Sequence, residues 1–134
     1  AYTRPCKGAA CIMAECLFVG IGGFIGSVCR YLIGLIPLSP SNGFPVKTLV
    51  INVAGAFAIG LIAAAAAKNA DISPRIVLLL KTGICGGFTT FSTFALEISD
   101  LIRGGSWAAA AAYMLLSLIL GVAAVFAAEA LMYM

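Results

Sequence analysis

The residues of this sequence that could do chemistry are concentrated in one run, from Gly83 to Phe94, inside a long apolar segment. Its first half is rich in glycine, which weakens a helix interior, so a helix could break here. Its second half places four hydroxyls between three phenylalanines: Thr89, Thr90, Ser92 and Thr93 with Phe88, Phe91 and Phe94. In lipid, backbone groups freed by a break need protein, water or an ion as partners. The run therefore predicts a site for something small at membrane depth.

Three further polar side chains are expected at that depth, Asn52, Tyr113 and Ser117. With the hydroxyls of the run they form a set of neutral donors, which can partly replace the hydration shell of a small anion. The electropositive edges of phenylalanine rings can contribute as well, whereas freed backbone carbonyls suit a small cation. The set has no nucleophile–base pair, and the sequence has no histidine, so an enzyme is the least favoured class.

The composition explains why the site must lie in a membrane. The chain has 134 residues, of which 63% are hydrophobic and only 10% charged, which is typical of an integral membrane protein. Each span needs about 20 apolar residues, so an all-α domain of four transmembrane helices uses most of the chain. The predicted spans are 16–38, 46–67, 73–103 with a break at 86–90 near the midplane, and 106–132. Residues 1–15 are predicted to be an extension at the membrane surface, outside the four-helix transmembrane domain 16–134.

Charged and sulfur-containing residues add further limits. The net charge is +3 without a charge run, so nucleic acid is an unlikely partner. None of the five cysteines forms a C-x-x-C pair, so zinc or redox motifs are unlikely, and Cys16, Cys29 and Cys85 are expected to be small packing residues. Gly22 and Gly26 share a face of the first span and predict close approach of another helix.

Arg30 lies on the same helix face as these glycines. A cation inside a span is costly. It either snorkels to the interface or stands at the mouth of a pore, and the two readings are equally favoured.

The basic residues of the loops are nearly balanced between the two sides of the membrane, so the positive-inside rule does not select an orientation. A small protein of this kind can insert both ways. Two oppositely oriented copies could form an antiparallel homodimer with two-fold symmetry in the membrane plane, which would bring their two breaks together.

Three motifs resemble those of one known family. Gly86–Phe94 (GGFTTFSTF) looks like the third-span signature of the Fluc (CrcB) fluoride channels. Gly22–Tyr31 (GGFIGSVCRY) and Thr48–Phe57 (TLVINVAGAF) look like the first-span and second-span motifs of that family. The motifs occur in the family's order, and the resemblance covers about residues 16 to 133.

The resemblance implies passive export of fluoride through two pores of a dual-topology homodimer in the lipid of a bacterial-type inner (plasma) membrane. It implies a structural sodium ion at the dimer interface, held by the backbone carbonyls of Gly86 and Thr89. It places Arg30 near the aqueous vestibule. The residues it assigns to the fluoride pore are Asn52, Thr90, Phe91, Ser92, Thr93, Phe94, Glu97, Tyr113 and Ser117. Gly121 departs from the pattern, because the polar stripe of the fourth span could continue there with a hydroxyl.

Two other functions remain open from the residues alone. A small dual-topology multidrug transporter would exchange protons for cations at a membrane-embedded carboxylate. Glu15 precedes the first span and Glu97 lies towards the end of the third, so neither is well placed. In a structural subunit of a larger complex, Phe91 and Phe94 would be core packing, which is the usual role of a Phe pair at helical spacing.

Overall fold

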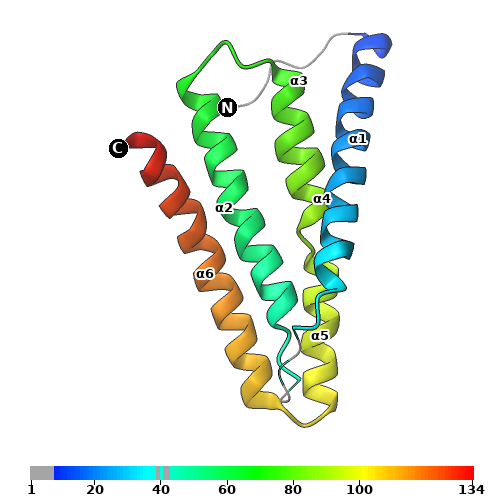
Figure 1. The fold of residues 1–134 in the computed structure, drawn as a ribbon, viewed down its shortest axis with the longest axis vertical. Coiled ribbons are helices and arrows are strands. Elements are labelled where there is room, and N and C mark those ends of the chain that lie inside the picture. The colour runs from blue at the N-terminus through cyan, green and yellow to red at the C-terminus, as the bar shows by residue number, and fades with distance from the viewer. Residues whose placement is uncertain (1–7, 39, 41–42) are drawn as a thin grey trace.

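The computed structural model describes residues 8–38, 40 and 43–134, and every regular element in this part of the chain is a helix. Four helical stretches are long and apolar enough to cross a membrane. They are Ala9–Gly34, Val46–Lys68, Pro74–Arg103 and Trp107–Tyr133. The predicted all-α fold with four candidate spans is therefore confirmed. In Figure 1 the start of α1, the α2–α3 connection and the C-terminus lie at one end of the molecule, and the α5–α6 turn lies at the other.

The helix boundaries follow local signals. α2 (Val46–Lys68) starts directly after Pro45, and α3 (Pro74–Val77) starts with proline after Ser73, where the missing N–H costs nothing. α5 (Phe91–Arg103) gives way to Gly104–Gly105, and Gly105 has a φ of 77°, before α6 (Trp107–Tyr133). These ends lie within one residue of the predicted spans.

The first helix differs from its predicted span. α1 runs from Ala9 to Gly34, so it begins inside the segment expected to be an extension and ends before Leu38. Residues 9–15 are mostly good helix formers and continue the helix, whereas Pro37 disfavours helical backbone just before it. Residues 1–7 of the predicted extension lie outside the described residues.

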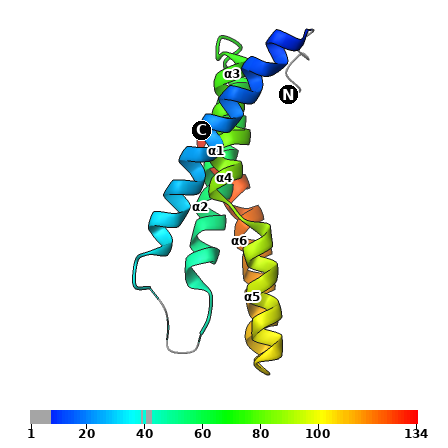
Figure 2. The same cartoon turned by 90° about the vertical axis from the view of Figure 1, so that its right-hand side faces the viewer.

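α1 crosses the third span, as Figures 1 and 2 show, and glycines of α1 let the two helices approach closely. A Cβ atom on Gly22 would collide with the carbonyl oxygen of Leu79, and one on Gly26 would collide with that of Ile84. The predicted glycine contact is confirmed, because only residues without a side chain permit this approach. Cys85 is buried near this crossing, as expected for a packing residue. Cys16 and Cys29 are exposed on α1 in the single chain, so that expectation is wrong for them here, because they lie away from the face that packs.

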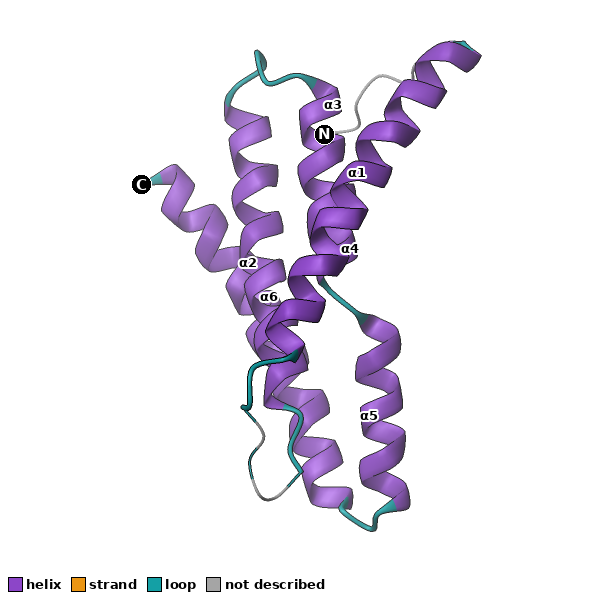
Figure 3. Ribbon diagram, turned by 45° about the vertical axis from the view of Figure 1, so that its right-hand side comes forward, coloured by secondary structure: helices purple, strands orange, loops and turns teal. Residues whose placement is uncertain are grey.

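The third span is the least regular element. After α3 it continues as a π-helix, η1 (Leu78–Cys85), and a short α4 (Gly86–Phe88). Thr89 and Thr90 then have extended backbone, with φ −77°, ψ 159° and φ −151°, ψ 115°, before α5 begins. Figure 3 shows the non-helical connection between α4 and α5. The π-helix has no counterpart in the sequence analysis, and π-turns are common at functional sites.

Candidate functional site

The extended pair is held in place by the asparagine of α2. The Thr90 N–H donates to Asn52 Oδ1 at 2.8 Å, and Asn52 Nδ2 donates to the Thr90 carbonyl at 3.1 Å. The side-chain amide thus takes the place of a helical neighbour for both backbone groups of Thr90, which is buried. α2 can come this close because a Cβ on Gly55 would collide with the Thr89 side chain.

This arrangement leaves backbone carbonyls without donors. In a continuous helix the Gly86 carbonyl would accept from the Thr90 N–H, which here belongs to Asn52. Among the described residues, no hydrogen bond reaches the carbonyl oxygens of Gly86 or Thr89. Gly86 is exposed, and a Cβ there would meet nothing within 4 Å. The carbonyl oxygens of Gly86 and Thr89, which the family resemblance assigns to sodium, are therefore still available as acceptors, and Gly86 is exposed.

Hydroxyl groups gather at the start of α5. Thr90 caps this helix, because its Oγ1 accepts from the Thr93 N–H at 3.2 Å. The same oxygen lies 3.0 Å from Thr93 Oγ1 and 3.4 Å from Ser92 Oγ. The extended backbone of Thr90 turns its hydroxyl towards these two side chains at the start of α5.

Three aromatic rings stand beside the hydroxyls. Phe91 and Phe94 have centroids 5.8 Å apart and planes inclined by 44°. Phe94 lies 5.0 Å from the ring of Tyr113, at 58°. Phe91 touches Phe94 but is 80% exposed in the single chain, so it lies outside the core of this chain. Packing of Phe91 in a larger complex, the alternative for the Phe pair, stays a prediction.

Glu97, three residues after Phe94 on α5, accepts two short hydrogen bonds. Thr48 Oγ1 donates to its Oε1 at 2.6 Å, and the Tyr113 hydroxyl donates to its Oε2 at 2.7 Å. Both donors are buried. Sequence reasoning gave Thr48 no role, although it lies four residues before Asn52 and so shares its helix face, a signal that could have found it.

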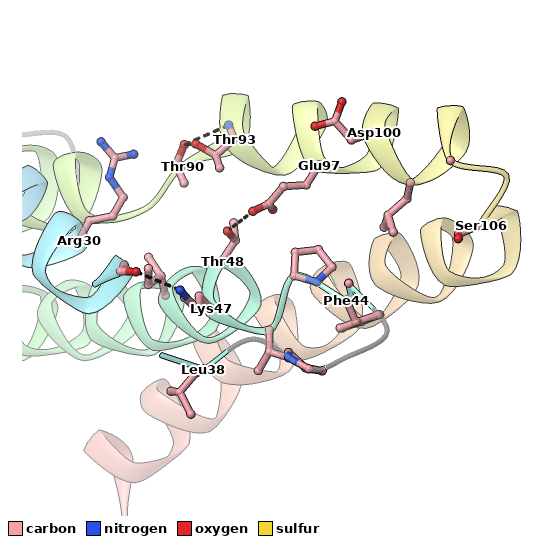
Figure 4. A pocket seen from close by; sticks show the side chains of 18 residues that line it. Arg30, Leu38, Phe44, Lys47, Thr48, Thr90, Thr93, Glu97, Asp100 and Ser106 are labelled. Atoms are coloured by element: carbon pink, nitrogen blue, oxygen red, sulfur yellow. Dashed lines mark hydrogen bonds between the residues drawn. The ribbon is translucent and has the colours of Figure 1, made fainter. Parts of the chain in front are cut away.

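Two cavities meet at this site and share Thr90. The larger, of about 740 Å³, opens at the α5–α6 end, and its lining includes Arg30, Lys47, Glu97 and Asp100. Figure 4 shows Arg30 on α1 across the cavity from α5, and Glu97 directed towards Thr48. Arg30 is half-buried here.

The smaller cavity, of about 430 Å³, is mainly apolar and carries no ionisable side chain other than the thiol of Cys85. Its lining includes Asn52, Gly86, Thr89, Phe91, Phe94 and Ser117. The Oγ of Ser117 is buried and has no hydrogen-bond partner among the described residues. Most of the predicted pore residues line these two adjoining cavities, and Arg30 lines the larger one. Ser92 and Tyr113 line neither cavity, although Tyr113 bonds to Glu97 and Ser92 lies 3.4 Å from Thr90 Oγ1.

Comparison with known proteins gives the family. The family model described as "CrcB-like protein, Camphor Resistance (CrcB)" matches residues 17–129. The chain belongs to the CrcB family. Together with the four apolar helices, membership makes it a multi-pass integral membrane protein.

Similar proteins are found in several bacteria. A protein of Chlorobium chlorochromatii is 46% identical over 84% of this chain and 88% of its own length. One of Chlorobaculum tepidum is 45% identical over 86% of this chain and 91% of its own. One of Agrobacterium fabrum is 42% identical over 89% and 96%. Each of these relatives is named "Fluoride-specific ion channel FluC".

Proposed function

We propose that this CrcB protein is a fluoride-specific ion channel, and not an enzyme, through which fluoride leaves the cell passively. The observation that carries the proposal is the pair of adjoining cavities around Thr90, lined by neutral hydrogen-bond donors and aromatic rings. The names of the relatives support the choice of ion.

The groups of the smaller cavity suit weak, transient binding of a small anion. Asn52 has two amide hydrogens and uses only one of them on Thr90, and the unpartnered Ser117 hydroxyl can donate as well. The rings of Phe91 and Phe94 can present their electropositive edges. Since no side-chain cation lies in this cavity, an anion would not be held too strongly to leave.

The larger cavity is proposed as the aqueous vestibule. Arg30 attracts anions there, while Thr93, Glu97 and Tyr113 continue the polar track from the rings. Ser92 would join the track from its exposed position at the start of α5. The relatives are bacterial, which supports a location in the inner (plasma) membrane.

The extended pair Thr89–Thr90 is proposed as a helix break near the midplane of the bilayer. α5 has 13 residues, which span about 20 Å, or somewhat over half of the hydrocarbon core. The helical part between Pro74 and Phe88 has a similar length. Backbone freed at such a depth needs polar partners, and Asn52 is one of them.

We further propose an antiparallel homodimer with two pores, in which the breaks of both copies meet. Gly86, Phe91 and Ser92 are exposed in the single chain, so a second copy could cover them. Lipid would cover the remaining apolar surface, such as Phe24 and Phe126, which are 72% and 67% exposed.

A sodium ion at the centre of that dimer is part of the proposal. The Gly86 and Thr89 carbonyls, which lack donors within the described chain, have the oxygen chemistry that sodium prefers. Two copies would supply two such pairs. When bound, the ion would neutralise the facing carbonyl dipoles and so help to hold the two chains together.

A proton-coupled multidrug transporter is the weaker alternative. It would use Glu97 as its exchanging carboxylate. Both oxygens of Glu97 already accept hydrogen bonds from buried hydroxyls, which favours a fixed acceptor over a group that must bind bulky cations. No observation on the site specifically favours transport of such cations.

Fluoride efflux from proteoliposomes, read with a fluoride electrode, tests the proposed function, with chloride efflux as the control. A channel should release fluoride within seconds to minutes and retain chloride. Absence of fluoride release from a well-folded, correctly sized protein would overturn the proposal, and cation uptake by the Glu97→Gln variant would then test the transporter.

A further inference from the structure

The third span carries one charge that the proposed function does not use, Lys81. It lies in η1, between the start of the span at Pro74 and the extended pair. Its side chain is exposed and makes no hydrogen bond or ion pair with any residue that the structure describes. A cation inside a span is costly and generally marks an ion pathway, a paired charge or a snorkelling side chain.

Lys81 points away from the helix packing of its own chain. Gly83 and Cys85 are buried, and Gly83 packs against Gly22 of α1. Lys81 and Gly86, by contrast, are both exposed. Figures 1 and 3 show η1 and α4 as one column leading into the connection to α5. Lys81 and Gly86 are therefore both on uncovered parts of the third span, before the connection to α5.

In the proposed antiparallel dimer, the exposed part of the third span that carries Lys81 faces the partner subunit. The inference therefore rests on that part of the proposed function. A two-fold axis through the break relates residues before it in one copy to residues after it in the other. Lys81 precedes Gly86 by five positions (86 − 81), and Phe94 follows Thr89 by five (94 − 89). Both then lie roughly 6–8 Å from the break along the span. Lys81 of one copy and Phe94 of the partner subunit would share the same depth.

We propose that Lys81 is a further determinant of fluoride conduction, supplying positive charge beside the phenylalanine pair of the partner subunit. The lining of the smaller cavity has only neutral donors, and Gly121 contributes no hydroxyl farther along α6. An ammonium group at the same depth lowers the energy of a poorly hydrated anion there, since charge interactions are strong where water is scarce. Lys81 is not part of the cavity lining, so its ammonium group does not contact the ion directly and does not trap it.

The test compares initial fluoride efflux for the wild type, Lys81→Met, Lys81→Gln and Lys81→Arg at several fluoride concentrations. Loss of the charge should lower the rate about tenfold at low fluoride and raise the half-saturating concentration. Arginine should keep the rate within about threefold of wild type, because it restores the charge. Arg75→Gln is the matched control, because it removes a charge near the start of the same span and should leave efflux unchanged.

The outcomes separate the two proposals. Fluoride efflux by the wild type with an unchanged rate for both neutral variants would overturn the role of Lys81 and mean that it snorkels to the lipid surface. Equal losses in Lys81→Arg and the neutral variants would also overturn it, since the effect would not follow charge. Cross-linking of each variant checks dimer assembly, and Lys81→Gln decides if Lys81→Met does not assemble. A wild type without fluoride efflux would refute the channel itself, and this inference with it.

Discussion

Replacement of Asn52 by leucine is the sharpest perturbation of this structure. Leucine has nearly the same size and shape but no polar group. The Thr90 N–H and C=O would lose their partners at 2.8 Å and 3.1 Å, while Thr90 stays buried at 8% exposure. No other hydrogen bond to either group is found among the described residues, and backbone groups left unpaired at membrane depth are costly.

The expected cost follows from two unsatisfied buried groups. Each costs about 1–3 kcal/mol, so the free energy of unfolding should fall by about 2–6 kcal/mol. For a chain of this length that corresponds to a drop in melting temperature of at least roughly 8 °C. Asn52→Asp keeps the acceptor for the Thr90 N–H but turns a carboxylate oxygen towards the Thr90 carbonyl. It should abolish fluoride efflux, since it replaces a donor with a buried anion.

Thermal unfolding in detergent and fluoride efflux from liposomes measure these two effects. Asn69→Ala is the matched control, because it also removes an asparagine that bonds to backbone, at 3.0 Å from Asp71 N, but in an exposed turn. It should change the melting temperature by less than about 4 °C. If Asn52→Leu unfolded like the control and conducted fluoride normally, the assignment of Asn52 as the partner of the extended backbone would be refuted.

Other substitutions test separate parts of the site. Phe94→Ile should slow fluoride efflux at least about tenfold and leave assembly intact, and normal flux would remove the ring-edge argument. Tyr113→Phe removes the 2.7 Å bond to Glu97 and should reduce efflux severalfold, whereas an unchanged rate would exclude this bond from the polar track. Gly26→Ala should lower the free energy of unfolding by more than about 2 kcal/mol in detergent, because its Cβ would collide with the backbone of the crossing helix. Gly20→Ala, with nothing within 4 Å of the added Cβ, should be nearly neutral, and equal effects of the two would contradict the packing argument.

The amino-acid sequence alone determined the class of the protein and most of its helices. Hydropathy over about 20 residues is a local property, so the second, third and fourth helical stretches could be located within one residue. The contact of Gly22 and Gly26 with another helix could also be predicted, because their spacing puts both on one face. The residues around the site could be named from the motifs of the third and second spans.

Tertiary structure decided how those residues are used. Asn52 and Thr90 are 38 positions apart, and nothing local in either segment shows that they bond to each other. The same holds for Thr48, Glu97 and Tyr113, which meet only because α2, α5 and α6 pack together. The π-helix from Leu78 to Cys85 packs against the glycines of α1. α1 itself begins at Ala9, because helix-forming residues extend it into the segment expected to lie at the membrane surface. The deciding hydrogen bonds join segments that are far apart in the sequence, so a local pattern predicts residues for the candidate site but not the bonds between them.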